Sequence, residues 1–470
     1  MVKTKRRSKF SDLMFTRQFT AFDRQNPESG KSPFHGFYTL VWIGVTIFIA
    51  QTSFNNYMAH GNIMGTNEIM ATMMHRDLLV LGISDGILYA TTGFGWALQV
   101  LIHRGWLTWN GAGYIIQSIW ELFYISFVVY WTLYREWPWT HTVFFVMHGI
   151  IMLMKQHSYA FYNGHLSEAY RARRSLVAQL KKLEDVEPAR TPGPMTPAVT
   201  SFMTSYLDDK PSGSELIHRK NFHRNHSELK DPQSGIAEIT AAIESGHDLD
   251  LEQVQLFERI MNWEIDALTE ELKGKTTVDS AAYPYNLTFI NHYAWVVLPT
   301  ATYELEYPRS EKINWEYVAE KALGTVGILF IMMLVSQSYI YPKVMQCVAM
   351  KEAQLPLWDR LMQFPGIYSD LIFPFMLEYL MAWYVIWECI LNLLAELTCF
   401  ADRGFYADWW NSVSWDQFAR DWNRPVHVFL LRHVYHSSIS TFKIGKGAAT
   451  LITFSISAVG KSLQPAYPPS

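Results

Sequence analysis

Seven runs of apolar residues, separated by polar segments, divide the 470-residue chain. A helix that crosses a bilayer needs about 20 mostly apolar residues, and most of these runs approach that length. Because a spanning segment must satisfy its own backbone hydrogen bonds, the pattern predicts an all-α polytopic membrane protein. The expected spans cover residues 37–50, 78–102, 112–134, 143–161, 322–341, 367–397 and 448–459.

A long polar segment interrupts this pattern after the fourth run. It is rich in charge, Pro, Ser and His, and contains two stretches with apolar residues at helical spacing. Basic sequences, "VKTKRRSK" near the start and "YRARRS" after the fourth run, are separated by an even number of spans, so both are expected in the cytosol. We therefore predict a basic cytosolic N-terminal segment (1–33), spans 1–4 (34–162), a cytosolic polar loop (163–282), spans 5–7 with a Trp-rich loop (283–459) and an atypical tail (460–470).

The composition agrees with a membrane location. Only 17% of the residues are charged and 15% are aromatic, whereas soluble proteins carry about 25% charged residues. The three cysteines lie in or beside apolar runs and form neither a disulfide framework nor a zinc pattern. No cleavable signal peptide is expected, because the first 33 residues are basic and polar. No metal, cofactor or nucleic-acid partner is predicted.

Polar residues inside the apolar runs are the first candidates for chemistry, because they cost free energy in a bilayer. Lys155, His157 and Ser158 lie at the end of the fourth run. Two interpretations stay open, a functional cluster or an interfacial cluster that reaches the lipid headgroups. His433 and His436 could share a helix face, but no acidic or Cys partner completes a metal site. The tail sequence "AVGKS" lacks the earlier Gly of a phosphate loop.

The segment 400–440 is polar and dense in Trp and Tyr, although it lies between two apolar runs. Asn423 precedes Pro425 by two residues, which is typical of a helix N-cap. Around it, "FYADWWN" (405–411) and "WNRPVHVFLLRHVYHSS" (422–438) resemble motifs of the membrane-bound O-acyltransferases that esterify sterols and diacylglycerol. The likeness is greatest to the fungal-type sterol acyltransferases. "PTATYELEYPRSEKINWEYVAEK" (299–321) and "MKQHSYAFYN" (154–163) resemble further family segments, in the same order.

The resemblance implies both a fold and a reaction. The fold would be that of the membrane-bound O-acyltransferases, with helices enclosing a tunnel, in a homo-oligomer of the endoplasmic reticulum membrane. The reaction would move a long acyl group from acyl-CoA to the hydroxyl of a membrane sterol, without a separate cofactor. Such chemistry needs a base for the hydroxyl proton and a donor for the oxyanion of the tetrahedral intermediate.

Matching positions carry the family's roles onto this chain. Asn423 would assist catalysis, and Trp422 would lie beside the acyl chain. The CoA path would be lined by Arg420, Tyr435, Lys446 and Ser457. Gln417 and Leu431 stand where some relatives have Asn and Tyr, so these two contacts are not carried over. The motif residues Phe405, Tyr406, Asp408, Trp409, Trp410 and Asn411 are expected to shape and brace the tunnel loop, with Asp408 paired to a neighbouring base.

The expected catalytic histidine is missing from the sequence. The family's seventh span continues in a pattern like "SAVVHE", but here the matching letters are "SAVGKS", with Lys461 at the histidine position. A free lysine, with a pKa near 10.4, is charged at neutral pH. The chain as written, in which the family's last helices are absent, is therefore expected to be nearly inactive and to pack poorly. Codons for Gly-Lys-Ser can contain GTAAGT, the usual sequence at the 5′ end of an intron. One hypothesis is therefore that residues 460–470 are encoded by an intron that was read as exon.

Two alternatives remain open. Diacylglycerol could replace the sterol as the acceptor, which would make the product triacylglycerol. Alternatively, the chain could be an inactive membrane subunit that assembles with an active relative.

Overall fold

The computed structural model describes residues 15–27, 31, 35–73, 77–184 and 251–437. In this part of the chain all regular elements are helices, apart from the isolated bridges Gln18–Asp402 and Arg309–Phe400. The predicted all-α class is therefore confirmed for the described residues. The chain divides into two compact units, one of residues 9–164 and 285–470 and a smaller one of residues 1–8 and 165–284.

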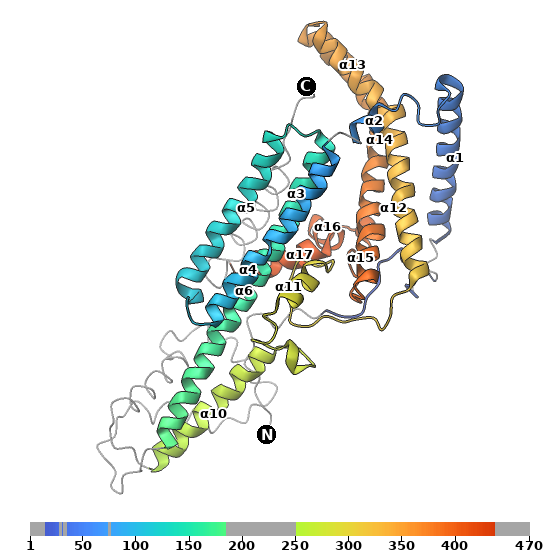
Figure 1. Ribbon diagram of the computed structural model, residues 1–470. Coiled ribbons are helices and arrows are strands. Elements are labelled where there is room, and N and C mark those ends of the chain that lie inside the picture. Colours follow the sequence, from blue (N-terminus) through green and yellow to red (C-terminus); the bar gives the residue numbers. More distant parts are fainter. Residues whose placement is uncertain (1–14, 28–30, 32–34, 74–76, 185–250, 438–470) are drawn as a thin grey trace. The chain divides into compact units, whose positions relative to one another are not determined.

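The larger unit holds most of the helices (Figure 1). Its α-helices are α1 (His35–His60), α2 (Glu68–Met73), α3 (Leu78–Thr91), α4 (Gly93–His103), α5 (Tyr114–Tyr134), the first part of α6 (Trp139–Glu184), α11 (Phe289–Val296), α12 (Trp315–Val335), α13 (Tyr341–Glu352), α14 (Leu357–Tyr384), α15 (Leu391–Leu397), α16 (Trp415–Trp422) and α17 (Arg424–Phe429). Short turns of other helix types join or extend these α-helices. They are the π-helical turns η2 (Trp109–Gly113), η4 (Ser336–Ile340), η5 (Val385–Ile390) and η7 (Leu430–Tyr435), and the 3₁₀ turn η6 (Trp409–Asn411).

Five helical stretches of the described residues are long and apolar enough to cross a membrane. They are Gly36–His60, Leu78–His103, Trp109–Tyr134, Trp315–Glu352 and Leu357–Leu397, and they contain the first, second, third, fifth and sixth expected spans. The fourth expected span, 143–161, is helical within α6 but is not one of the five, because polar residues occupy its second half. The seventh expected span lies outside the described residues.

Helix starts follow local side-chain chemistry. The Asn314 side chain accepts hydrogen bonds from the backbone N–H groups of Glu316 and Tyr317 at the start of α12. Thr288 and Ser414 cap α11 and α16 in the same way. Each cap satisfies backbone donors that have no partner in the first helical turn.

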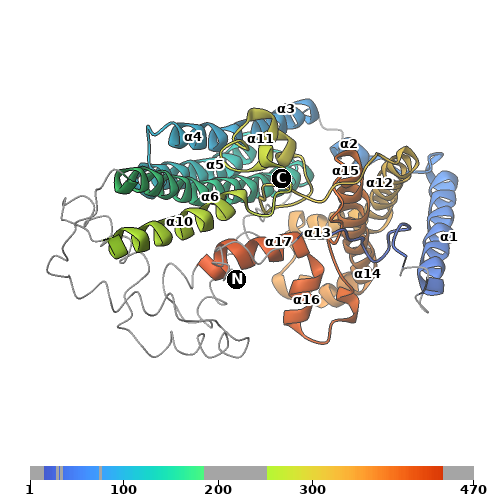
Figure 2. The same ribbon diagram turned by 90° about the horizontal axis from the view of Figure 1, so that it is seen from below.

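Helices α12, α14 and η5 form one packed group, with α1 at its edge beside α12 (Figures 1 and 2). Ile328 and Val335 of α12 pack against Leu377, Met381 and Val385. The apolar face of α1 is mostly exposed, as expected of a helix that faces lipid. The same group contacts the segment that follows α15, because Trp383 of α14 lies 4.6 Å from Tyr406.

Helices α3 to α6 pack as a second group. Leu98 and Ile102 of α4 lie against Trp109 of η2 and Ala160 of α6. Gly164 of α6 faces Trp109 so closely that a Cβ atom there would overlap the indole ring. Such a close approach is open only to glycine.

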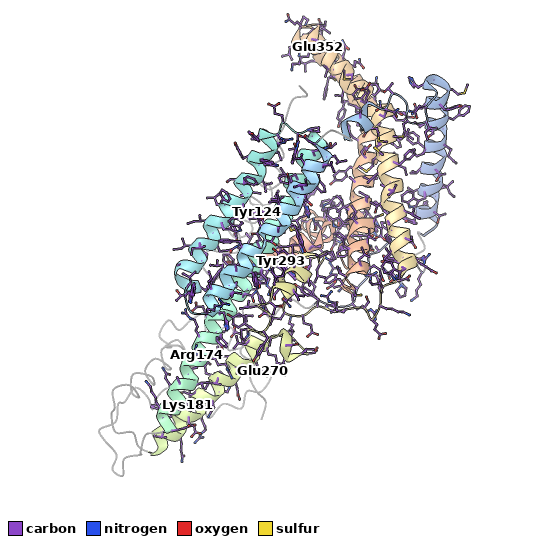
Figure 3. The ribbon with its side chains drawn as sticks, viewed as in Figure 1. Tyr124, Arg174, Lys181, Glu270, Tyr293 and Glu352 are labelled. Carbon is purple, nitrogen blue, oxygen red and sulfur yellow. The ribbon has the colours of Figure 1, made fainter. Side chains whose placement is uncertain are left out.

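The smaller unit contains the second part of α6, α10 (Leu251–Lys273) and the short turn η3 (Asp279–Ala281). Its surface carries charges, among them Arg174 and Lys181 of α6 and Glu270 of α10 (Figure 3). His165 and Glu271 join α6 to α10 through a 2.6 Å contact between Nε2 and Oε1.

Candidate active site

The indole of Trp422 lies in an aromatic cluster built by α14, α16 and the turn η6. Tyr379 and Trp383 are four residues apart, so they share one face of α14. Trp422, the last residue of α16, stacks on Tyr379 with 5.4 Å between ring centroids and 11° between planes. Phe418 stacks on it at 5.4 Å and Trp409 meets it edge-on at 4.7 Å. These contacts hold the indole in one orientation.

Asn423 follows directly and caps α17. Its side-chain oxygen accepts a 3.2 Å hydrogen bond from the backbone N–H of Val426, and Pro425 stands in the first turn. The N-cap interpretation is therefore confirmed. Because the cap engages the carboxamide oxygen, the two N–H donors of the same amide are left to face other acceptors.

The residues expected along the CoA path are only partly described. Arg420 lies on α16, where it forms a 2.9 Å ion pair with Asp416; both side chains are exposed. Tyr435 is half-buried at the end of η7, with its ring 5.4 Å from that of His436. Lys446 and Ser457 lie outside the described residues. Arg420 and Trp422 both lie in the last turn of α16, directly before Asn423.

The aromatic residues of the "FYADWWN" segment make ring contacts, although Trp410 is 41% exposed. Phe405 and Tyr406 are buried. Trp409 lies 5.2 Å from Trp383 of α14, and Trp410 stacks on Phe22 at 4.7 Å. The segment therefore links α14 to residues near the N-terminus.

The two polar residues of the same segment face outward. The backbone N–H of Asn411 donates to the carbonyl oxygen of Asp408 at 2.9 Å, which closes the turn η6. Both side chains are exposed. The ion pair expected between Asp408 and a neighbouring base is not formed with any described residue.

A buried carboxylate, Glu388 of η5, connects the motif to the rest of the unit. Its Oε1 accepts from the ammonium of Lys321 at 2.6 Å. Its Oε2 accepts from Thr20 at 2.7 Å and from the phenol of Tyr406 at 2.8 Å. Burial raises the pKa of Tyr406 well above its ordinary value, so the phenol remains a donor. Glu388 is not among the residues predicted from the sequence, although a charged residue inside an apolar run is a signal of a functional position.

The polar residues of α6 form a second buried network. Ser158 accepts from the backbone N–H of Tyr303 at 2.8 Å, and its hydroxyl group shares a second 2.8 Å hydrogen bond with Nε2 of His433. His157 pairs through Nδ1 with Glu121 of α5 at 3.0 Å. The network therefore joins α5, α6, η7 and the segment before α12.

The interfacial interpretation of Lys155 is wrong. Its side chain does not extend to lipid headgroups, because only 4% of the residue is exposed. Its ammonium donates to the carbonyl oxygens of Leu298 and Thr300, both at 2.6 Å. Lys155 therefore fixes the loop after α11 to α6.

The two histidines differ in burial. His433 lies within η7 and is buried, whereas His436 directly follows η7 and is exposed. Within the described ranges no group of His, Cys, Asp and Glu could hold a metal ion. Beside His433, Arg432 forms a buried 2.9 Å ion pair with Glu304.

Comparison with known proteins found one matching family and several relatives. Residues 123–460 match the family described as MBOAT, membrane-bound O-acyltransferase. The chain is 32% identical over 452 residues to "Probable sterol O-acyltransferase 1" of Schizosaccharomyces pombe, which covers 96% of this chain and 75% of that protein. It is 31% identical over 463 residues to "Sterol O-acyltransferase 2" of Candida albicans, covering 97% and 70%. "Diacylglycerol O-acyltransferase 1" of Corylus americana is 33% identical over 210 residues, covering 44% and 38%.

Proposed function

Because the chain belongs to the membrane-bound O-acyltransferase family, we propose that it is built to transfer a long-chain acyl group from acyl-CoA to the hydroxyl of a membrane sterol. The choice of a sterol as the acceptor rests on the share of this chain that each relative matches. The similarity to two sterol O-acyltransferases extends over 96% and 97% of this chain. The similarity to the diacylglycerol O-acyltransferase extends over only 44% of it, so diacylglycerol is the second candidate acceptor.

The geometry supports a role for Asn423 as a hydrogen-bond donor to the reacting carbonyl oxygen. The cap engages the carboxamide oxygen, so the N–H groups of the same amide are not needed for the cap and can donate elsewhere. A donor held in place before the reaction stabilises a developing oxyanion without reorganisation. The aromatic cluster around Trp422 supplies an apolar surface for an acyl chain.

The remaining residues have supporting roles in this proposal. Basic and polar groups recognise the phosphates of CoA. In this proposal the path of these phosphates is lined by Arg420, Tyr435, Lys446 and Ser457. Phe405, Tyr406, Trp409 and Trp410 brace the loop that carries Trp422, and Asp408 and Asn411 close the turn η6.

The acceptor is tested in cells that make neither steryl esters nor triacylglycerol. Two forms are expressed, the 470-residue chain and a form in which residues from Gly460 on are replaced by the matching segment of the S. pombe relative. We expect steryl ester from the second form and little from the first, because Lys461 is a poor base. Triacylglycerol without steryl ester would refute the sterol assignment, and steryl ester from the first form would refute the expectation for Lys461.

The role of Asn423 is tested in the active form with two substitutions. Asn423→Asp keeps an N-cap acceptor but removes both amide donors, so we expect folding close to that of the parent and a loss of about 100-fold or more in the rate. Asn423→Ala removes cap and donors together and should also destabilise the protein by about 1 kcal/mol. If Asn423→Asp retained full activity, the side chain would be a helix cap and nothing more.

We further propose that the protein is a homo-oligomer of the endoplasmic reticulum membrane with the segment 163–282 in the cytosol. The sequence "NHS" at Asn225 lies in that segment and should remain unglycosylated. Detection of a glycan at Asn225 would show that this segment faces the lumen and would contradict the proposed orientation. Crosslinking in intact membranes tests the oligomer, and monomers alone would contradict it.

A further inference from the structure

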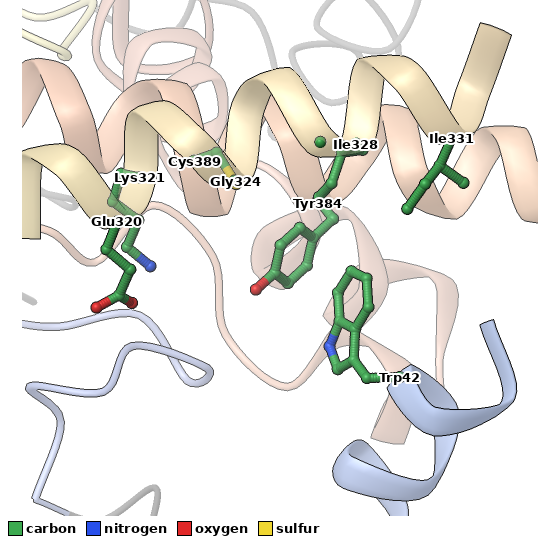
Figure 4. A pocket seen from close by; sticks show the side chains of 9 residues that line it. Trp42, Glu320, Lys321, Gly324, Ile328, Ile331, Tyr384 and Cys389 are labelled. Carbon is green, nitrogen blue, oxygen red and sulfur yellow. The ribbon is translucent and has the colours of Figure 1, made fainter. Parts of the chain in front are cut away.

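The buried cations of the larger unit are held by partners. Lys321 lines a cavity of about 290 Å³ beside α1, α12 and α14 (Figure 4), where its ammonium pairs with Glu388 at 2.6 Å. Arg432 pairs with Glu304 at 2.9 Å. The second half of α6, in the smaller unit, differs, because several of its cations are exposed and have no such partner among the described residues.

Four cations lie on one face of this half of α6. They are Arg171, Arg174, Lys181 and Lys182. An α-helix turns by about 100° per residue, so these positions fall within a sector of roughly 100°. The Arg171 side chain is 39% exposed, and the other three residues are exposed as well. We call this face the basic stripe; Ser175, also exposed, lies at its edge.

The neighbouring helix does not neutralise the basic stripe. Helix α10 packs against the opposite side of α6, where Leu176 and Leu183 are buried and Arg173 donates to Thr269 at 2.7 Å. Within the described ranges the stripe has one ion pair, a long contact of 3.8 Å between Arg171 and Glu168 of the same helix. Its charge is therefore available to a partner outside this unit.

Charge is segregated between the two helices of the smaller unit. Helix α10 exposes the carboxylates of Glu258, Asp266 and Glu270. In Figure 3, Arg174 and Lys181 extend from α6 and Glu270 extends from α10. A surface that serves solubility alone carries both signs interspersed. Here an anionic partner is attracted by α6 and repelled by α10, so it can approach in only one orientation.

A membrane surface is the anionic partner that the helix itself brings close. Helix α6 is unbroken from Trp139 to Glu184, and its first half is the fourth expected span, so on the proposed topology lipid headgroups lie near the start of the stripe. The cytosolic leaflet of cell membranes carries anionic lipids, and each Lys or Arg near it strengthens the attraction about fivefold.

A soluble acidic partner fits less well, because it must first offset its lost translational and rotational freedom. This loss weakens association by roughly a thousandfold or more. All four cations together supply roughly 600-fold at about fivefold each, which does not offset it. The stripe, in contrast, is already held beside the membrane by its own helix, so a few cations suffice there.

We propose that the basic stripe binds the headgroups of anionic phospholipids, with the acidic face of α10 turned away from the membrane. The proposal rests on the proposed cytosolic placement of residues 163–282. Lys181 lies about 15 Å further along the helix than Arg171, since each residue adds about 1.5 Å. That separation exceeds the Debye length of about 8 Å at physiological salt. Arg171 and Arg174 therefore contribute most of the attraction.

Photocrosslinking identifies the lipid that contacts the stripe. A benzophenone amino acid replaces Ser175, and the purified 470-residue protein is irradiated in nanodiscs that contain equal amounts of phosphatidylserine and phosphatidylcholine. Mass spectrometry counts the two adducts. We expect about fivefold or more phosphatidylserine adduct, falling towards equal amounts in 1 M salt, where the Debye length is about 3 Å. Equal adducts at low salt would refute the proposal.

Two double variants remove the same charge from different parts of the stripe. Arg171→Gln/Arg174→Gln should lower the enrichment about fivefold or more, to nearly equal adducts. Lys181→Gln/Lys182→Gln should lower it by less than about twofold, because these cations lie beyond one Debye length from the near pair. Equal effects of the two variants would indicate a partner that spans the whole stripe, such as a soluble acidic peptide, and would overturn the choice of a membrane.

A third variant controls for net charge. Arg259→Gln/Lys273→Gln removes two cations from α10 and should leave the enrichment unchanged. A loss equal to that of Arg171→Gln/Arg174→Gln would refute a role for the stripe. Nanodiscs present the same lipids on both faces, and the readout needs no acyl transfer. A glycan at Asn225 or a failure to esterify sterol would therefore refute the proposed orientation or function without altering these adducts.

Discussion

At the scale of single residues, the surroundings of a buried imidazole determine its protonation state. His292 of α11 is 1% exposed. Its Nε2 lies 3.3 Å from the Thr92 hydroxyl, which already donates to the carbonyl oxygen of Tyr89, so the imidazole is the donor to Thr92. Its Nδ1 is buried without a hydrogen-bond partner among the described residues, which suits a neutral ring.

The stability of the folded protein is expected to depend on pH through His292. Burial, with a smaller effect of nearby Lys155, lowers the pKa of His292 from 6.5 to about 4. The unfolded chain therefore binds the proton at higher pH than the folded protein does. The stability that the neutral ring contributes is complete above pH 6.5 and is lost as the pH falls towards 4, by up to about 3 kcal/mol.

Thermal unfolding in detergent between pH 7.5 and 4.5 measures this effect. His292→Gln keeps a polar side chain that does not titrate, so its melting temperature should fall less steeply with decreasing pH. Parallel curves for the two proteins would show that His292 does not contribute.

At the scale of elements, close helix packing depends on single small residues. Gly164→Ala would place a methyl group against the indole of Trp109, and we expect a loss of about 1–3 kcal/mol in the free energy of unfolding. Gly86→Ala is the control, because a Cβ atom there has no atom within 4 Å. It should leave stability unchanged or raise it by about 1 kcal/mol. Equal melting temperatures for the two variants would contradict the packing of η2 against α6.

A buried ion pair joins η7 to the segment that precedes α12. Arg432 and Glu304 have side chains that are 4% and 8% exposed. Arg432→Met alone leaves the carboxylate buried without its cation and should cost about 3–5 kcal/mol. The double variant Arg432→Met/Glu304→Leu should recover part of that loss, since no charge remains. Additive losses in chemical unfolding would argue against direct coupling.

Those features of the fold that depend on a single local property of the sequence could be predicted from it. Length and hydropathy alone locate α1, α12 and α14, and the Asn-x-Pro pattern alone locates the cap at Asn423. The burial of Lys155 was not predictable, because its partners are carbonyl oxygens more than 140 residues away. Nor could the π-helical turn η7 be read from the spacing of His433 and His436, since that spacing fits an α-helix equally well.

At the scale of the whole larger unit, residues near the N-terminus are part of the packed interior. Phe22 stacks on Trp410 at 4.7 Å and on Tyr38 at 5.1 Å, so it bridges α1 and the turn η6. Asp23 accepts from the Tyr317 hydroxyl at 2.6 Å. The polar N-terminal segment predicted from composition therefore has a docked portion at residues 15–27, a feature that only long-range contacts reveal.

Phe22→Ala tests this docking. We expect a loss of about 1–3 kcal/mol, because half-buried aromatic contacts disappear on two sides. Phe54→Ala is the matched control, since 63% of Phe54 is exposed on α1. It should change the melting temperature little, by an amount that corresponds to less than about 0.5 kcal/mol. Equal effects of the two substitutions would exclude a structural role for the segment.

The hydrogen bond between Thr20 and Glu388 has a consequence for biosynthesis. The two residues are 368 positions apart, and ribosomes add about 5–20 residues per second, so Thr20 waits roughly 20–70 s before its partner is made. During this interval α1 can already be inserted, while most partners of the segment before it, among them Tyr317, Glu388 and Trp410, are not yet made. A bulky fusion at the N-terminus should consequently leave membrane insertion intact but slow the last step of maturation. In a pulse-chase experiment, the newly completed chain should then become resistant to protease later than the chain without the fusion.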